Sequence, residues 1–166
     1  MSKYDFDDVR TLADHINYLY PNLSRIRLNS TFIMLFVYYH SSIKGGPKPE
    51  YLFNGTIVVY NTGSDIKEIK EEFKNHHYSR SEGYKPKRYK FDENSELDNV
   101  ICKMIKYTYT ELEENFTDFE LFVMVTDMIL HSLDSKEYFN NDKPIPHDLM
   151  LESAYDYVKD NNEEEE

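Results

Sequence analysis

The residues that could perform chemistry are few and lie scattered along the chain. His76 and His77 are the only adjacent histidine pair, but neighbouring side chains on a helix or a strand point apart. No cysteine or carboxylate cluster at metal-ligand spacing accompanies the pair, so a zinc site is disfavoured. The acidic pairs at 71–72 and 113–114 are also sequence neighbours, whereas a catalytic carboxylate dyad needs two acids that converge in a pocket.

Recognisable catalytic motifs are missing from the sequence. It contains no nucleophile elbow, phosphate-binding loop, dinucleotide fingerprint or metalloprotease helix. Cys102 is the only cysteine and lies in an apolar helical pattern, which indicates a buried structural thiol rather than a nucleophile. We therefore expect a protein that is not an enzyme and that binds no cofactor and no metal. An enzyme with an unrecognised pocket is the disfavoured alternative.

The charge of the chain restricts its partners. The sequence has 31 Asp and Glu against 19 Lys and Arg, a formal net charge of -12. Direct nucleic-acid binding is disfavoured because phosphate contacts need Lys and Arg, and an anionic membrane surface is disfavoured for the same reason. A protein with a basic surface is the favoured partner, since opposite charges speed and select association. A more specific hypothesis is that the carboxylates mimic the phosphates of nucleic acid. The alternative is that the negative charge serves only to keep the protein soluble.

Residues 75–94, here called the basic loop, are rich in Lys and Arg, unlike the rest of this acidic chain. Lysines and arginines alternate there with Tyr78, Tyr84 and Tyr89. Such a pattern can bind single-stranded nucleic acid, because bases stack on aromatic rings and phosphates contact cations. It can equally fold back on the acidic remainder of the protein, and we favour a loop that is either mobile or neutralised by the protein's own acids. The 15 tyrosines of the chain also suit protein contacts, although an AT-rich genome would favour tyrosine codons as well.

The sequence predicts a cytoplasmic protein without a membrane partner. The first residues, Met1 to Asp8, are polar and acidic, unlike a signal peptide. The longest apolar run, Phe32 to Tyr39, is far too short to span a bilayer. Residues 1–160 are expected to form a single domain, and the like charges near the end predict a disordered acidic tail at 161–166.

Hydrophobic periodicity predicts a mainly α protein with a small β element, of the α+β class. Apolar residues recur at helical spacing near residues 8–18, 29–39, 66–74, 96–110, 118–133 and 147–158. Asp7 or Asp8 is expected to cap the first of these helices, and Thr117 or Asp118 the fifth. The stretches 29–39 and 118–133 are apolar on nearly all sides, which indicates deep burial. We expect five to six helices around a buried central helix, with a short strand or hairpin near residues 51–60.

The most informative stretch runs from Leu52 to Phe73. Residues 52–60 have high strand propensity, 61–63 are typical turn residues, and an amphipathic helix follows. Ser64 or Asp65 is expected to cap that helix. The order of strand, glycine turn and helix is the chain's most specific pattern.

Together with its neighbours, this stretch resembles the Panacea antitoxin domain, also called SocA-like and found in phage GepA-type proteins. Residues 26–34 correspond to the family's run L-K-L-Q-K-L-L-Y-F, and Leu52-Phe53 to the start of its P-L-F-x-E-x-F-E-A-W-x-Y-G-P-V-V-P motif. Gly63 keeps the family's glycine, and residues 145–150 correspond to I-P-D-E-L-I. Tyr60 replaces the tryptophan, Ser64 and Lys67 replace two prolines, and residues 117–126 lack a Thr-His ending, so the chain resembles a divergent member over residues 8–155.

The resemblance implies a non-enzymatic protein that binds and neutralises a cognate toxin protein. A phage-encoded inhibitor of a bacterial defence system, anti-CRISPR-like and acting as an acidic nucleic-acid mimic, is the alternative. An aromatic anchor beside a turn and a helix N-terminus is a reasonable contact site. The expected partner-binding residues around the turn are Phe53, Tyr60, Asn61, Gly63, Asp65 and Ile66. The competing interpretation is that Phe53, Tyr60 and Ile66 are core residues.

Overall fold

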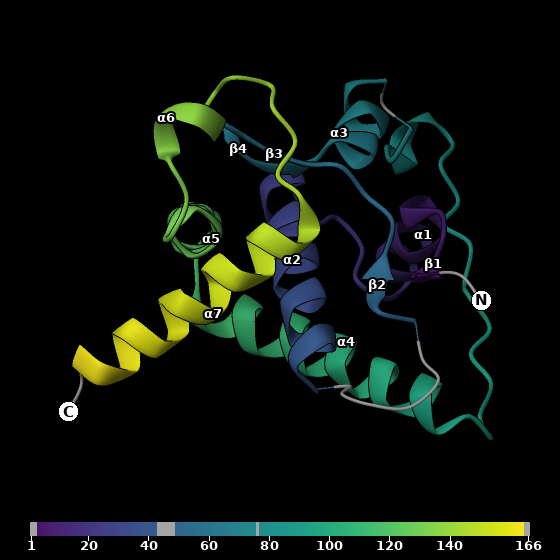
Figure 1. The fold of residues 1–166 in the computed structure, drawn as a ribbon. Helices are drawn as coiled ribbons and strands as arrows, with labels where there is room; N and C mark the ends of the chain where they lie inside the picture. The colour runs from purple at the N-terminus through teal and green to yellow at the C-terminus, as the bar shows by residue number, and fades with distance from the viewer. Residues whose placement is uncertain (1–2, 43–48, 76, 165–166) are drawn as a thin grey trace.

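The computed structural model in Figure 1 describes residues 3–42, 49–75 and 77–164. This part of the chain is mainly helical with two small sheets, which confirms the predicted α+β class. The helices are α1 (Val9–Leu19), α2 (Arg25–Ser42), α3 (Lys67–Lys74), α4 (Glu96–Asn115), α5 (Asp118–Leu130), α6 (Ser135–Tyr138) and α7 (His147–Glu164). The strands are β1 (Tyr4–Phe6), β2 (Tyr51–Phe53), β3 (Ile57–Tyr60) and β4 (Gly63–Ile66). The sequence did not predict the four-residue α6 or the 3-10 turn at Arg80–Glu82.

Helix α2 is the buried centre of the molecule, as expected. It packs against α4, α5, β2 and β4 (Figure 1). Leu28, Phe32 and Phe36 are fully buried along it. The helix starts at Arg25, four residues earlier than predicted, because the polar residues of its first turn bond to distant parts of the chain.

Helix α1 follows the prediction closely. The side chain of Asp8 accepts a hydrogen bond from the backbone N–H of Arg10, which caps the helix. Val9, Leu12 and Ile16 form its buried face. This face and the cap fix α1 beside β1 and α3.

The predicted strand at 51–60 is two strands that belong to different sheets. β2 pairs in parallel with β1, while β3 pairs with β4 in an antiparallel hairpin. Asn54 and Gly55 separate them, and Gly55 lies where a Cβ atom would stand 2.9 Å from the Ile66 side chain. The backbone approaches Ile66 so closely that only glycine fits without a shift.

The glycine turn is present, but the predicted helix cap after it is wrong. Gly63 has a φ of 151°, a conformation that favours glycine. Ser64 and Asp65 pair with Val59 and Val58 in the hairpin, so they continue the strand instead of capping a helix. Helix α3 begins only after Ile66 and has no side-chain cap bond.

The C-terminal helices extend or qualify the predictions. Thr117 caps α5 through a reciprocal capping box with Glu120, as expected. Helix α4 runs five residues beyond the predicted end at 110. Helix α7 includes residues 161–164, so this part of the expected disordered tail is helical. Among the described residues, no helix is long and apolar enough to cross a membrane.

Candidate partner-binding surface

The six predicted contact residues lie in or beside the β3–β4 hairpin, but four of them, Phe53, Gly63, Asp65 and Ile66, are buried. Phe53, Asp65 and Ile66 are 0% exposed. The ring of Phe53 packs edge-on against Phe32 and Phe36, with centroids 5.4 and 5.1 Å away. Phe53 and Ile66 are therefore core residues and offer no contact area to a partner.

Asp65 has a structural partner within the chain. Arg25 Nη1 donates to both carboxylate oxygens of Asp65, at 2.8 and 2.7 Å, and Arg25 Nη2 donates to the Thr62 carbonyl at 3.0 Å. Burial raises the pKa of Asp65, although the Arg25 charge favours its ionised form. The pair ties the first turn of α2 to β4, beside the buried Gly63.

Tyr60 and Asn61 keep some access to solvent at the hairpin tip. The Tyr60 hydroxyl donates to Asp142, and Lys70 Nζ lies 3.6 Å from the Tyr60 ring centroid. Burial and the neighbouring Asp142 carboxylate raise the pKa of Tyr60 to about 12. Asn61 is exposed, and its N–H donates to the Asn140 side chain at 3.4 Å. The hairpin tip is therefore a small surface that its own chain partly covers.

A larger apolar surface lies on the outer side of α5. Leu121, Val125, Met128 and Ile129 face the core, yet Phe119 and Val123 are exposed on the opposite side. Leu130, at the end of the same row, is partly buried and packs against the core. Phe119 is 70% exposed and Val123 39%. Together with Thr126, these residues recur at intervals of four, three and four, so they form one row along the helix. The Thr126 hydroxyl is hydrogen-bonded to the buried Ser64 on β4 at 2.7 Å, so the exposed part of the row is Phe119 and Val123. We call Phe119, Val123, Thr126 and Leu130 the α5 stripe.

The sequence shows that the helix is apolar, but the prediction of deep burial on all of its sides is wrong. Residues 118–133 are apolar on nearly all sides, and deep burial was the expectation. In the structure one side is core and the other faces solvent, so the expectation is wrong for Phe119 and Val123. A helix that is apolar on both sides is equally typical of an interface.

Acidic side chains border the α5 stripe. The helix carries Asp118, Glu120 and Asp127 and no basic residue. At its C-terminal end the stripe meets a hollow of about 640 Å³, in which Thr126 and Leu130 lie beside Phe139 and Tyr157. Lys136 and His131 also line this hollow, and His131 bonds to Asp160 at 2.6 Å. The stripe therefore combines exposed apolar groups with a negative border.

The basic loop contacts α1 through Arg80 and Tyr84. Arg80 Nη2 donates to the Asn17 carbonyl at 2.7 Å, and the Tyr84 hydroxyl bonds to Asp14. Tyr89 packs edge-on against Phe6, so this ring is occupied by the protein itself. The lysines and Arg88 of the loop nevertheless form no ion pair within the described part of the chain.

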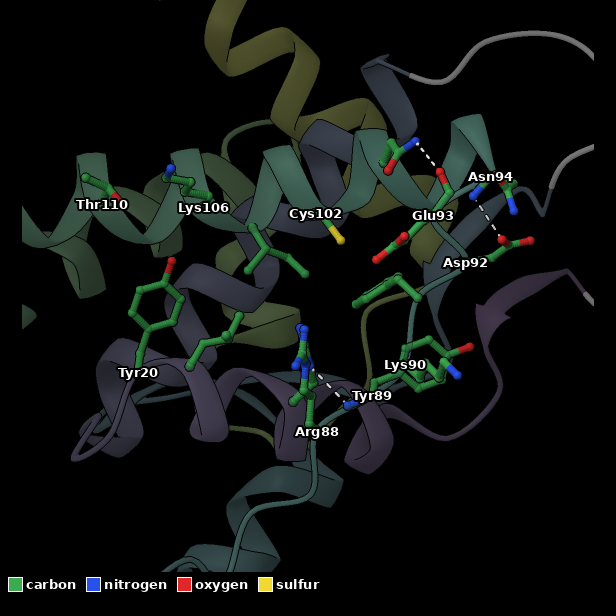
Figure 2. Close-up of a pocket in the computed structure, with 15 residues that line it drawn as sticks. Tyr20, Arg88, Tyr89, Lys90, Asp92, Glu93, Asn94, Cys102, Lys106 and Thr110 are labelled. Atoms are coloured by element: carbon green, nitrogen blue, oxygen red, sulfur yellow. Dashed lines mark hydrogen bonds between the residues drawn. The ribbon is translucent and has the colours of Figure 1, made fainter.

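Between α1, the end of the basic loop and α4 lies a groove of about 1210 Å³ (Figure 2). Cys102 lines it and is exposed, so the expectation of a buried thiol is wrong. Partial burial of the thiol and the negative charge of the nearby Asp98 raise the pKa of Cys102, which disfavours the reactive thiolate. Within the described ranges no three His, Cys, Asp or Glu side chains are placed to hold a metal ion, and His76 lies outside those ranges.

The comparisons with known proteins add no relative. No family model, no curated protein and no solved structure matches this chain.

Proposed function

We propose that this protein is a non-enzymatic binding module that covers a surface of another protein with the α5 stripe. One observation carries the proposal: a helix whose inner side is core exposes two apolar side chains, Phe119 and Val123, one turn apart on its outer side. Exposed apolar side chains aligned on one helix are typical of interaction sites, whereas single ones are ordinary.

The acidic border specifies the chemistry of the partner. Glu120 and Asp127 would face Lys or Arg side chains that flank an apolar patch or an amphipathic helix, whereas Asp118 is already paired with Arg27 of α2. The formal charge of -12 supports such a partner, because long-range attraction speeds its approach. An antitoxin that binds and neutralises a cognate toxin in the cytoplasm is the specific form that the resemblance to the Panacea domain supports.

The test compares stripe variants in binding and in function. Affinity purification from the native cell identifies the co-purifying protein, and binding is then measured with purified components. Phe119→Ser combined with Val123→Ser should weaken binding at least tenfold, because it removes exposed apolar area that contributes only on association. The matched control is Val158→Ser, which changes an exposed valine on α7 and should leave affinity unchanged.

Growth assays separate the antitoxin from a general binding module. Expression of the identified partner alone should arrest growth, and co-expression of the wild-type chain should restore it. The double stripe variant should fail to restore growth while it retains the wild-type melting temperature. If the wild-type chain and the double variant restored growth equally, the α5 stripe would not be the toxin-binding surface.

A second candidate is a phage-encoded inhibitor of a bacterial defence system that acts as an acidic nucleic-acid mimic. The charge of -12 supports it, because carboxylates can occupy a groove that normally holds phosphates. Such an inhibitor would depend on many dispersed acids, and the stripe variants would affect it little.

A further inference from the structure

The groove beside the basic loop has the size and walls of a ligand site. Its volume of about 1210 Å³ is comparable to the largest ligand pockets, which reach roughly 1,000 Å³. One wall comes from the end of α1 with Leu19 and Tyr20, and the opposite wall from α4 with Ile105. Tyr20 stacks on Tyr109 with the ring centroids 5.0 Å apart, which holds this aromatic wall in place.

A cation lies in the middle of this groove. In Figure 2, Arg88 extends from the basic loop toward the side of α4 that carries Cys102. Its charge lowers the pKa of His15 on α1 and opposes the upward shift of the Cys102 pKa on α4, so the guanidinium acts on both walls. Arg88 has no carboxylate within 4.0 Å in the described part of the chain.

His15 supplies a second donor at the base of the groove. The side chain is only 5% exposed, and its Nδ1 accepts a hydrogen bond from the Tyr89 N–H at 3.1 Å. Because Nδ1 accepts this bond, the ring is the neutral tautomer with its proton on Nε2. Burial and the Arg88 charge lower the pKa of His15, which favours the same neutral form. Among the described residues, Nε2 has no hydrogen-bond partner.

The charges of the groove are divided between its ends. Asp92 and Glu93, with Lys90 near them, line the end next to Asn94, and Lys106 lines the end next to Tyr20 and Thr110 (Figure 2). An anion is therefore repelled from one end and attracted to the middle and the Tyr20 end. A guanidinium is the side chain best shaped to bind a carboxylate through two parallel hydrogen bonds.

We propose that this groove binds a small organic carboxylate with an apolar or aromatic body. Arg88 binds the carboxylate, His15 Nε2–H is the adjacent donor, and the body packs against Leu19, Tyr20 and Ile105. The site is separate from the α5 stripe and does not depend on the function proposed for it.

The test uses 1-naphthoate as the probe and neutral 1-naphthamide as its matched analogue, with calorimetry and amide chemical shifts as readouts. Naphthoate should bind saturably and shift the amides of Leu19 and Ile105, and naphthamide should bind at least tenfold more weakly. Arg88→Gln should weaken naphthoate binding at least tenfold and leave naphthamide unchanged. The control Lys159→Gln removes an exposed charge on α7 and should change neither. Equal binding of acid and amide, or full affinity in Arg88→Gln, would overturn the proposal.

The single cysteine gives an independent readout of occupancy. Cys102 lines the groove, so bound naphthoate should slow its alkylation by iodoacetamide at least fivefold in the native protein. An unchanged alkylation rate at saturating naphthoate would place the ligand elsewhere and contradict the assignment. The absence of any saturable binding would do the same.

Discussion

At the scale of single residues, the bond between Arg25 and Asp65 carries the clearest energetic consequence. The carboxylate is 0% exposed and both of its oxygens accept from one guanidinium. Arg25→Met should lower the free energy of unfolding by about 3 kcal/mol at pH 7, because it leaves a buried charge without its partner. Chemical denaturation of the variant and the wild type measures the difference.

The loss should depend on pH in a defined direction. Without Arg25, the folded-state pKa of Asp65, which burial already raises, rises further above its unfolded value. In the variant, protonated Asp65 stabilises the fold at low pH, and this stabilisation is lost as pH rises. The free energy of unfolding of Arg25→Met should therefore fall less below that of the wild type near pH 4 than near pH 8. Arg10→Met is the matched control: Arg10 pairs with Glu72 near the surface, and such pairs contribute at most about 1 kcal/mol. Equal losses in both variants would contradict the assignment.

Asp5 on β1 predicts a second pH effect. Burial and the neighbouring Asp98 raise its pKa from 3.8 to about 6, and the rings of Tyr39 and Tyr89 lie within its electrostatic reach. The folded state therefore binds the proton more tightly, so stability from this group is lost as pH rises through about 6. Asp5→Asn should stabilise the fold at pH 8 by about 1 kcal/mol, allowing for solvent screening, and by nothing at pH 4. Glu152→Gln on the exposed side of α7 should have no effect at either pH.

At the scale of the elements, one side chain joins three helices. Arg27 on α2 donates to the Leu112 and Phe116 carbonyls at the end of α4 and to Asp118 at the start of α5. Arg27→Lys should destabilise the protein by about 2 kcal/mol, because a lysine cannot make these three bonds together. Thr117→Ala, which removes only the α5 cap, should cost about 1 kcal/mol. Thermal denaturation gives both values, and a smaller loss in the lysine variant than in the cap variant would contradict this role of Arg27.

The sequence predicted the elements that are determined by residues close together in the chain. The cap at Asp8 and the capping box at Thr117 involve residues two or three positions apart, so the local sequence located these helix starts to within one residue. The division of residues 51–60 between two sheets depends on β1, which lies more than 40 residues earlier. No local pattern contains that pairing.

The predicted contact site failed in part for the same reason. Asp65 has the residue type of a helix cap, but its partner Arg25 lies 40 positions away in the sequence. Burial of Phe53 likewise depends on Phe32 and Phe36 from α2. The α5 stripe was visible as apolar residues, yet the sequence does not say which side of an all-apolar helix meets the core.

At the scale of the whole molecule, helix α5 and the basic loop lie on opposite sides of α2 (Figure 1). A basic partner that approaches α5 therefore stays clear of the lysines in the loop. The carboxylates of α5 lie next to the stripe, so electrostatic attraction and apolar contact act on the same surface.

Salt distinguishes this arrangement from nucleic-acid mimicry. Apolar burial hardly depends on ionic strength, whereas a surface that replaces many phosphates loses affinity steeply as counterions compete. We expect the dissociation constant of the partner complex to rise less than about tenfold between about 50 and about 500 mM NaCl, with most of the change in the association rate. The double variant Phe119→Ser and Val123→Ser should instead raise the dissociation rate at every salt concentration. A loss of about a thousandfold in affinity across that salt range, with the double variant unaffected, would favour the acidic mimic over the binding module.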